Sequence, residues 1–262
     1  MERVERAGHA RVGDASVRDG KVLVVGVGGL GSPAALALAL AGVGTIGLVD
    51  PDTVELSNLQ RQILHFTPDL GRPKVYSAQE KLQRMNAAIT VVPYVQRLSA
   101  NNLAALFAGY DFIIDGTDGL ETKFLINDGA VLLKKPFSYA GIVQFHGQTL
   151  TVLPERTTCL RCLFPVPPDP DEIPTCQEAG ILGSLAGSLG IVQANEAVKY
   201  LRGGEELLTD RLLTYDALAL RWREVRVRRS PRCPLCGTRP TITTLQPQAR
   251  QAMPGTRSLA GQ

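Results

Sequence analysis

The chain has 262 residues, 44% hydrophobic and 20% charged, which is the composition of a globular protein that can bury a sizeable core without disulfides. This length suits one large domain or two small ones. The net charge of +3 is too small to indicate binding to nucleic acid or to a membrane surface.

The N-terminal half is predicted to alternate strands with helices. Residues 1–21 are rich in charge and lack the apolar segment of a signal peptide, so we expect a cytoplasmic protein. Residues 32–49 carry no charge, but Pro33 and three glycines interrupt them, which favours a helix and a buried strand over a membrane span. The predicted strands are 21–27, 45–49, 89–95, 112–115 and 137–139, and the predicted helices are 32–41, 74–85, 101–108 and 121–133. This alternation indicates a Rossmann-like α/β fold, in which a mostly parallel sheet carries helices on both faces.

The pattern changes after Gly141, where antiparallel strands are expected. Residues 142–145 and 149–153 flank His146-Gly147-Gln148, which indicates a hairpin turn. The elements expected next are a proline-rich loop at 154–180, an apolar helix at 181–201, and strands at 212–215 and 221–227, the last with one face in solvent. We predict a nucleotide-binding α/β half at 1–141, an antiparallel extension of the same domain at 142–245, and a disordered tail at 246–262.

A glycine-rich turn, Gly26-Val27-Gly28-Gly29-Leu30-Gly31, joins the first predicted strand to the first long helix. Its G-x-G-x-x-G spacing lets the backbone approach phosphates, and the helix N-terminus adds free N–H groups and positive potential. Asp50, at the end of the second strand, can bind ribose hydroxyls. Taken by itself, such a segment most often binds NAD or FAD.

Two cations that follow the second strand favour a different ligand. Arg61 lies in the segment Ser57–Gln62, and Lys74 ends the segment Arg72-Pro73-Lys74. A dinucleotide dehydrogenase does not need both cations, whereas a triphosphate does, because its charge must be neutralised while pyrophosphate leaves. Arginine offers a bidentate fork and lysine a point charge. The alternative is that both side chains form ordinary surface salt bridges.

Asp118 is a candidate ligand of Mg²⁺. The segment Asp115-Gly116-Thr117-Asp118 closes the strand at 112–115, at the carboxyl edge of the sheet, where open α/β folds bind ligands. An aspartate there can hold Mg²⁺ against phosphates. It can equally cap the N-terminus of the helix that follows.

Four of the five cysteines form two C-x-x-C pairs, Cys159 with Cys162 and Cys233 with Cys236. Two such pairs predict a tetrahedral Cys₄ zinc site, with redox dithiols or two disulfides as the alternatives. The fifth, Cys176, lies just before a predicted helix, whose N-terminus lowers the pKa of a thiol. A nucleophilic role is therefore open to it, although a lone cysteine is more often inert.

Together these motifs resemble the ThiF/MoeB/HesA family, the bacterial relatives of ubiquitin-activating enzymes. The resemblance extends in a single order from about Lys21 to Leu245. The segments that carry it are Gly26–Gly31, Asp50-Pro51-Asp52, Ser57–Gln62, Arg72-Pro73-Lys74, Gly116-Thr117-Asp118, the two C-x-x-C pairs and Thr175–Gly180.

The resemblance implies that ATP and Mg²⁺ are used to adenylate the C-terminal Gly-Gly carboxylate of a small β-grasp sulfur-carrier protein, for thiamine or molybdopterin biosynthesis, by a homodimer. The implied nucleotide-binding residues are Gly26, Gly28, Gly29, Gly31, Asp50, Asp52, Asn58, Arg61, Gln62, Lys74 and Asp118. The implied catalytic residues are Arg61, Lys74, Asp118 and Cys176. The implied zinc ligands are Cys159, Cys162, Cys233 and Cys236. Only Arg3 or Arg6 could take the place of the N-terminal arginine with which the family reaches the partner subunit's ATP.

Two other classes of protein are the alternatives. One is a nicotinamide dehydrogenase that uses the same glycine turn, but the sequence offers no evident hydride-transfer partner and has only three histidines. The other is a family member that binds the carrier but has lost catalysis. No rhodanese-like domain follows in the sequence, so sulfur is expected to come from a separate protein.

Overall fold

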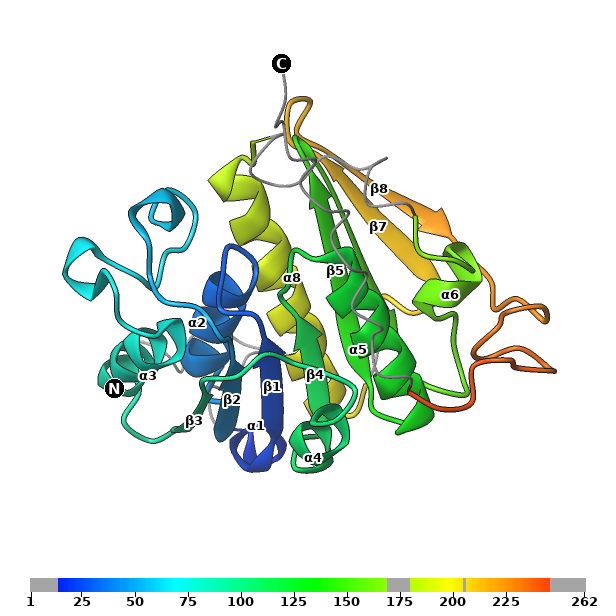
Figure 1. Cartoon of the computed structure of the whole chain (residues 1–262), viewed down its shortest axis with the longest axis horizontal. Coiled ribbons are helices and arrows are strands. Elements are labelled where there is room, and N and C mark those ends of the chain that lie inside the picture. The colour runs from blue at the N-terminus through cyan, green and yellow to red at the C-terminus, as the bar shows by residue number, and fades with distance from the viewer. Residues whose placement is uncertain (1–13, 169–179, 205, 246–262) are drawn as a thin grey trace, which may run out of the picture.

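An eight-stranded sheet runs through the centre of the structure (Figure 1). The computed structural model describes residues 14–168, 180–204 and 206–245. The strands are β1 (Lys21–Val25), β2 (Thr45–Val49), β3 (Thr90–Tyr94), β4 (Phe112–Asp115), β5 (Phe137–Val143), β6 (His146–Val152), β7 (Arg211–Asp216) and β8 (Arg221–Arg226). Their order is β3-β2-β1-β4-β5-β6-β7-β8. Neighbours from β3 to β5 pair in parallel, and those from β5 to β8 pair antiparallel.

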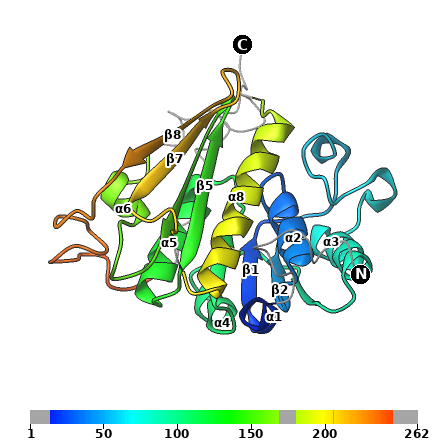
Figure 2. The same cartoon turned by 180° about the vertical axis from the view of Figure 1, so that it is seen from behind.

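Helices cover both faces of this sheet (Figures 1 and 2). One face carries α2 (Gly31–Ala41), α3 (Lys74–Met85) and α8 (Gly183–Leu201). The other carries α4 (Leu103–Ala108), α5 (Leu120–Leu132) and α6 (Leu160–Leu163). A short helix, α1 (Ala15–Asp19), precedes β1, and 3-10 helices at Leu56–Asn58 and Thr67–Asp69 lie in the loop between β2 and α3. The predicted α/β class, a largely parallel sheet with an antiparallel extension, is confirmed.

Two apolar cores fill the space between the sheet and its helices. Side chains alternate along β1, so that Val22 and Val24 join the core under α2 and α8, whereas Leu23 and Val25 join the core under α4 and α5. Because both faces of the parallel strands are covered, these strands read as continuous apolar runs in the sequence.

The predicted hairpin is confirmed, but its turn was placed wrongly. β5 continues to Val143, which pairs with His146, so the turn is Gln144-Phe145 and not His146-Gly147-Gln148. Gly147 lies inside β6, where a Cβ would come within 2.4 Å of a Leu189 methyl carbon on α8. Glycine at this position therefore reflects the close packing of α8 on the sheet instead of a turn.

β8 is the last strand of the sheet and is exposed on both faces, whereas only one solvated face was expected. All six of its residues are exposed, and the ring of Trp222 stacks on that of Tyr215 with centroids 4.1 Å apart. An edge strand has a neighbour on one side only, which here is β7.

The division of the chain at residue 141 stays a prediction. β5 crosses that position, so the sheet itself is continuous from the first half into the extension. The segment predicted as a disordered tail, 246–262, lies outside the described residues. Among the residues that the structure describes, no helix has the length and apolar character needed to cross a membrane.

Gly47 on β2 provides a test of the packing between the sheet and its neighbours. A Cβ there would lie 2.3 Å from the Tyr110 hydroxyl and 2.6 Å from a Leu23 methyl carbon. We expect Gly47→Ala to lower the free energy of unfolding by about 1–3 kcal/mol, because the core is overpacked. The matched control is Gly109→Ala, whose Cβ would have no neighbour within 4 Å. Equal denaturant midpoints for the two variants would contradict this packing.

Candidate functional site

A cavity opens at the carboxyl edge of the parallel strands, beside β1 and β4. The strand order changes direction there, because β2 and β3 extend the sheet on one side of β1 while β4 and β5 extend it on the other. Open α/β sheets bind ligands at such a switch point. Of the residues predicted from the sequence, the cavity is lined by Gly26, Gly28, Gly29, Asp50, Asp52, Arg61, Gln62, Lys74 and Asp118.

Close backbone contacts shape the glycine turn. Gly26 has a φ of 86°, a left-handed conformation that favours glycine. A Cβ on Gly31 would lie 1.7 Å from the Gly26 carbonyl oxygen, so Gly31 serves the packing of α2 against the turn and is not among the residues that line the cavity. Within the described part of the chain, the N–H groups of Gly28, Gly29 and Leu30 donate no hydrogen bond. They are available to an anion at the N-terminus of α2.

Asp50 ties the end of β2 to the glycine turn. Its carboxylate accepts hydrogen bonds from the N–H groups of Val27, at 2.7 Å, and Asp52, at 2.9 Å. Burial raises the pKa of this carboxyl above the ordinary value of 3.8, and the nearby Lys74 ammonium opposes that shift. Because Asp50 also lines the cavity, its remaining lone pairs can accept hydrogen bonds from ribose hydroxyls.

The two predicted cations, Arg61 and Lys74, both line the cavity. The Lys74 side chain is only 8% exposed, and its Nζ lies 3.0 Å from the carboxylate of Asp52, which is 57% exposed. Arg61 forms no salt bridge within the described residues, and its Nη1 donates to the Ser57 carbonyl at 3.3 Å. The alternative of ordinary salt bridges is therefore not observed for Arg61, whereas Lys74 does form an ion pair, with its own side chain buried beside the cavity.

Gln62 presents an unpartnered acceptor next to the glycine turn. Its side chain is buried, lies against Gly28, and has no hydrogen-bond partner for Oε1 within the described residues. A buried acceptor of this kind calls for a ligand or a water molecule.

Asn58 is not among the residues that line the cavity. Its carbonyl accepts the N–H groups of Arg61 and Gln62 at 3.1 and 3.0 Å, so it supports the segment that presents them. A direct contact of Asn58 with a nucleotide stays a prediction.

Buried Asp115 organises the turn that carries Asp118. One carboxylate oxygen accepts hydrogen bonds from the N–H and the hydroxyl of Thr117, at 3.1 and 2.7 Å. Asp118 is exposed at the cavity. The N-cap of α5 is Gly119, and no side chain caps this helix, so the alternative role of Asp118 as a helix cap is not observed.

Lys123 is a cavity-lining cation that the sequence analysis missed. Its Nζ donates to the Asp115 carboxylate at 3.1 Å and to the Ala140 carbonyl at 2.5 Å, and it lies 5.5 Å from the ring centroid of Tyr139. The available signal was a lysine next to Phe124 in an apolar stretch of α5. A charge in such a place is costly unless it is paired, so a buried carboxylate partner could have been expected.

The four cysteines Cys159, Cys162, Cys233 and Cys236 come together away from the cavity, against the core under α4 and α5. All four sulfurs lie within 4.8 Å of one another, and four of the six separations are between 3.4 and 3.9 Å. Disulfide sulfurs are about 2.05 Å apart, whereas a tetrahedral ion with bonds of about 2.3 Å holds its sulfurs roughly 3.8 Å apart. The cluster could therefore bind zinc, and the disulfide alternative is not observed.

Three other residues singled out in the sequence, Cys176, Arg3 and Arg6, lie outside the described residues.

Two curated proteins are similar to this chain over most of its length. A sulfur carrier protein adenylyltransferase of Thermus thermophilus is 44% identical over 234 residues, which cover 87% of this chain and 86% of the relative. A probable adenylyltransferase/sulfurtransferase MoeZ of Mycobacterium tuberculosis is 43% identical over 226 residues, which cover 85% of this chain and 58% of the relative. The chain thus spans little more than half the length of MoeZ.

The fold also occurs in a solved structure. The crystal structure of E. coli MccB matches with a TM-score of 0.75 and 21% identity, over 86% of this chain and 67% of that one. At this identity the likeness concerns the fold alone. A model described as the ThiF family matches residues 6–235, which is most of the sequence. The resemblance found in the sequence is confirmed: this chain belongs to the ThiF family.

Proposed function

We propose that this chain uses ATP to adenylate the C-terminal carboxylate of a small sulfur-carrier protein and releases pyrophosphate. The observation that carries the proposal is the cavity at the switch point. It brings the glycine turn, Arg61, Lys74 and Asp118 together around a space whose other walls include buried Asp50. The names of the relatives, which are adenylyltransferases, support the same reaction.

In this reaction a carboxylate oxygen of the carrier attacks the α-phosphorus of ATP, and the bond from that phosphorus to the pyrophosphate oxygen breaks. Free N–H groups of the glycine turn hold phosphate oxygens, and Asp50 holds the ribose. Arg61 and Lys74 offset the charge that builds up on the departing pyrophosphate. Catalysis is then positioning plus electrostatic stabilisation of an in-line displacement.

Asp118 is the proposed ligand of Mg²⁺. Its carboxylate is exposed at the cavity and does not cap α5, so its oxygens are available to a hard cation. A bound Mg²⁺ would supply additional charge neutralisation at the phosphates.

The carrier is proposed to be a β-grasp protein that ends in Gly-Gly, from thiamine or molybdopterin biosynthesis. Leu30, Ile142, Ile181 and Ala186 add an apolar wall to the cavity. A tail without side chains can pass such a wall and bring its terminal carboxylate to the phosphates. Cys176 is proposed as a nucleophile toward the activated carrier, on sequence grounds alone.

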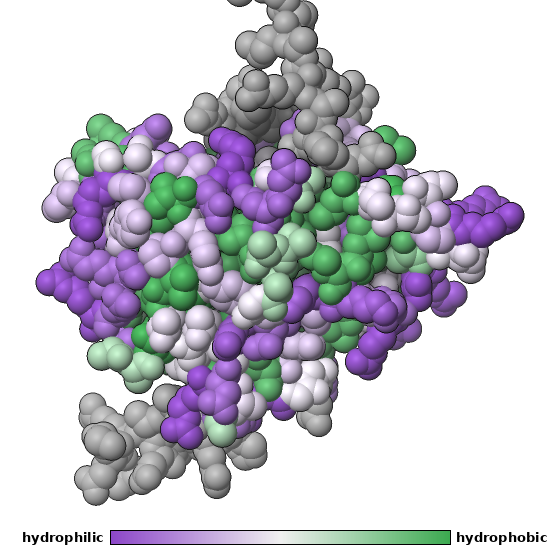
Figure 3. Space-filling view, turned by 60° about the horizontal axis from the view of Figure 1, so that its bottom comes forward, coloured by the Kyte–Doolittle hydropathy of each residue, from purple (hydrophilic) through white to green (hydrophobic). Residues whose placement is uncertain are grey.

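A homodimer in the cytoplasm is proposed for the whole protein. Six of the eighteen large exposed apolar residues of the described chain lie between positions 56 and 85, namely Leu56, Ile63, Phe66, Leu70, Tyr76 and Met85. Figure 3 shows apolar areas interspersed with polar ones on one face of the molecule. Exposed apolar surface of this kind is typical of protein–protein contacts, and a second copy of the chain is the proposed occupant.

The proposed role of the cysteine cluster is a structural zinc site. Zinc with four thiolates has no open position for catalysis, and the cluster does not line the cavity. Its ligands come from the start of α6 and from the segment after β8, so the ion would join two segments that are far apart in the sequence.

Lys74→Ala tests the adenylation proposal. The exchange of labelled pyrophosphate into ATP, measured with a Gly-Gly-ending carrier, should fall about 10- to 150-fold in kcat/KM, because one charge-assisted contact to the triphosphate is lost. Lys134→Ala is the matched control, since Lys134 is an exposed lysine whose ion pair, within the described residues, is with Glu155. Exchange by Lys74→Ala at the wild-type rate would count against the proposal. Normal carrier binding without any exchange by the wild-type protein would favour a binding protein instead.

Cys233→Ser tests the metal site. The purified variant should lose most of the roughly one zinc ion per chain expected of the wild type, and its Tm should fall by roughly 5 °C or more. Cys176→Ser is the control, because it also removes a thiol but leaves the four clustered sulfurs in place. Metal analysis by mass spectrometry that gives equal zinc contents for both variants would refute the assignment.

A further inference from the structure

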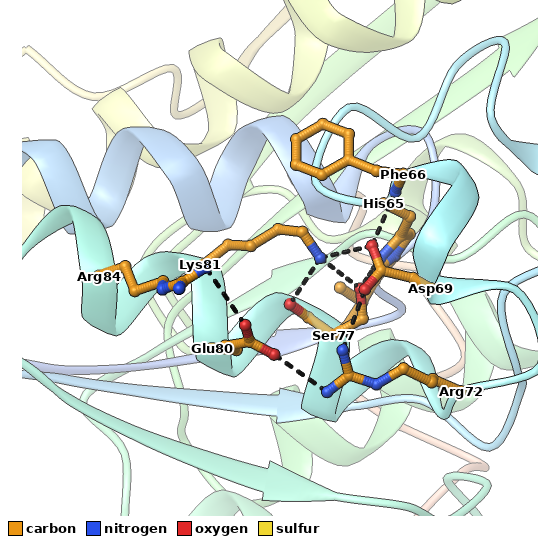
Figure 4. Close-up of polar contacts among 9 residues, drawn as sticks. His65, Phe66, Asp69, Arg72, Ser77, Glu80, Lys81 and Arg84 are labelled. Atoms are coloured by element: carbon orange, nitrogen blue, oxygen red, sulfur yellow. Dashed lines mark hydrogen bonds and ion pairs between the residues drawn. The ribbon is translucent and has the colours of Figure 1, made fainter.

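A chain of hydrogen bonds connects α3 to the glycine turn, and Figure 4 shows its members Asp69, Ser77 and Lys81 next to His65. Lys81 Nζ donates to the Asp69 carboxylate at 2.5 Å and to the Ser77 hydroxyl oxygen at 2.9 Å. That hydroxyl lies 2.9 Å from Nδ1 of His65, and Nε2 of the same ring lies 3.0 Å from the carbonyl oxygen of Val27. His65 and Ser77 are buried, and none of these side chains lines the cavity.

The partners of this chain determine the tautomer of His65. The Val27 carbonyl can only accept, so Nε2 must carry the proton and donate. Nδ1 is then an acceptor in the neutral ring, and the Ser77 hydroxyl donates to it. The hydroxyl is free to do so because its own oxygen accepts from Lys81, whose charge is balanced by Asp69.

The Val27 carbonyl is the point at which this chain acts on the phosphate-binding turn. The peptide bond from Val27 to Gly28 is trans, and in a planar trans peptide the C=O and N–H groups point in opposite directions. Fixing the carbonyl toward His65 therefore aims the Gly28 N–H the other way. Gly28 lines the cavity, and its N–H donates to no acceptor in the described part of the chain.

The same peptide segment is held from two other directions. The hydroxyl of Ser32 on α2 donates to the Val27 carbonyl at 3.0 Å, and the Val27 N–H donates to Asp50 at 2.7 Å. Of these three contacts, only that of His65 links the turn to α3. Ser77 lies three residues after Lys74 on that helix, on neighbouring positions of one face. The imidazole thus spans the turn and the helix that carries the phosphate-facing lysine.

We propose that His65 is a positioning residue of the nucleotide site: as a neutral ring protonated on Nε2, it holds the Val27 carbonyl so that the Gly28 N–H points at a phosphate, at a set distance from Lys74. The proposal rests on the proposed function, since it assumes that a nucleoside triphosphate occupies the cavity. His65 itself touches neither the nucleotide nor the reacting atoms.

The charges around His65 favour the neutral ring. Burial lowers the pKa of His65 below 6.5, and the Lys81 and Lys74 ammonium groups lower it further, while the Val27 carbonyl and the Asp69 carboxylate act in the opposite direction. A histidine with a depressed pKa contributes stability that is complete above about pH 6.5 and is lost as the pH falls from there toward the folded-state pKa. Adenylation assayed above pH 6.5 therefore finds the ring in its positioning form.

His65→Phe and His65→Gln form the test pair. Phe fills the space of the ring without a donor, whereas the Gln amide N–H can reach about as far as Nε2. In pyrophosphate exchange at pH 7.5, His65→Phe should raise KM for ATP about tenfold, the loss of about one hydrogen bond to the site, with kcat within about twofold. His65→Gln should restore most of this affinity. Arg84→Ala, an exposed residue at the rim of the same network, should behave as wild type.

Measuring KM for ATP and kcat separately distinguishes the loss of a positioning residue from a general loss of protein stability. A variant that is merely unstable would contain less active protein, so its apparent kcat would fall with KM unchanged. That result, or an unchanged KM for ATP in His65→Phe, would overturn the proposal. If the wild-type protein itself fails to bind ATP in calorimetry, the proposed function fails instead, which is a different result.

A measurement on the wild-type protein covers the case in which His65→Phe does not fold. Spectra of the full chain labelled with ¹⁵N-histidine distinguish protonated from unprotonated ring nitrogens, and His65→Gln identifies the resonances of His65 among the three histidines. The proposal requires a neutral ring with the proton on Nε2 at pH 7.5. A ring with the proton on Nδ1, or a charged ring at that pH, would refute it.

Discussion

The contact of three glycine backbones at the switch point is the constraint on which the cavity depends. A Cβ on Gly31 would lie 1.7 Å from the Gly26 carbonyl oxygen, and one on Gly116 would lie 2.8 Å from the same atom. With no side chains between them, the turn after β1, the first residue of α2 and the turn after β4 meet through backbone alone. The free N–H groups at the start of α2 and the carboxylate of Asp118 consequently line the same cavity. Any larger residue would force α2 away from the sheet.

Charged groups around this contact are held in place by partners. Lys123 pairs with Asp115 in the interior, and Lys74 pairs with the more exposed Asp52. Asp50 is held by two backbone N–H groups. A site whose dipoles and charges are already oriented does not have to reorganise when a triphosphate arrives, which is the usual source of electrostatic catalysis. The neutral His65 fits this arrangement, because a third cation beside Lys74 and Lys81 would be disfavoured.

Helix α5 joins the cavity to the cysteine cluster. Its first turns carry Lys123, while near its end Asn127 accepts the N–H of Leu160 at 2.9 Å and Asp128 forms an ion pair with Arg161 at 2.6 Å. Leu160 and Arg161 lie between two of the clustered cysteines. These contacts link the cluster to the helix that follows the Asp118 turn, although the cysteines lie away from the cavity. A structural ion can support the site in this way without taking part in the chemistry.

The sequence alone determined those features that local rules govern. Alternating apolar runs predicted the strands and helices, and the helix at 74–85 matches α3 residue for residue. The spacing of Gly26, Gly28 and Gly31 predicted the glycine turn between β1 and α2, and the C-x-x-C pairs predicted the cysteine cluster. Tertiary structure alone decided what depends on contacts between distant segments. It placed Gly147 against α8 inside a strand, paired Lys123 with Asp115, and set His65 between the turn and α3. Such partners cannot be predicted from a residue's neighbours along the chain, because the burial of a side chain and the direction in which it points depend on the packed fold.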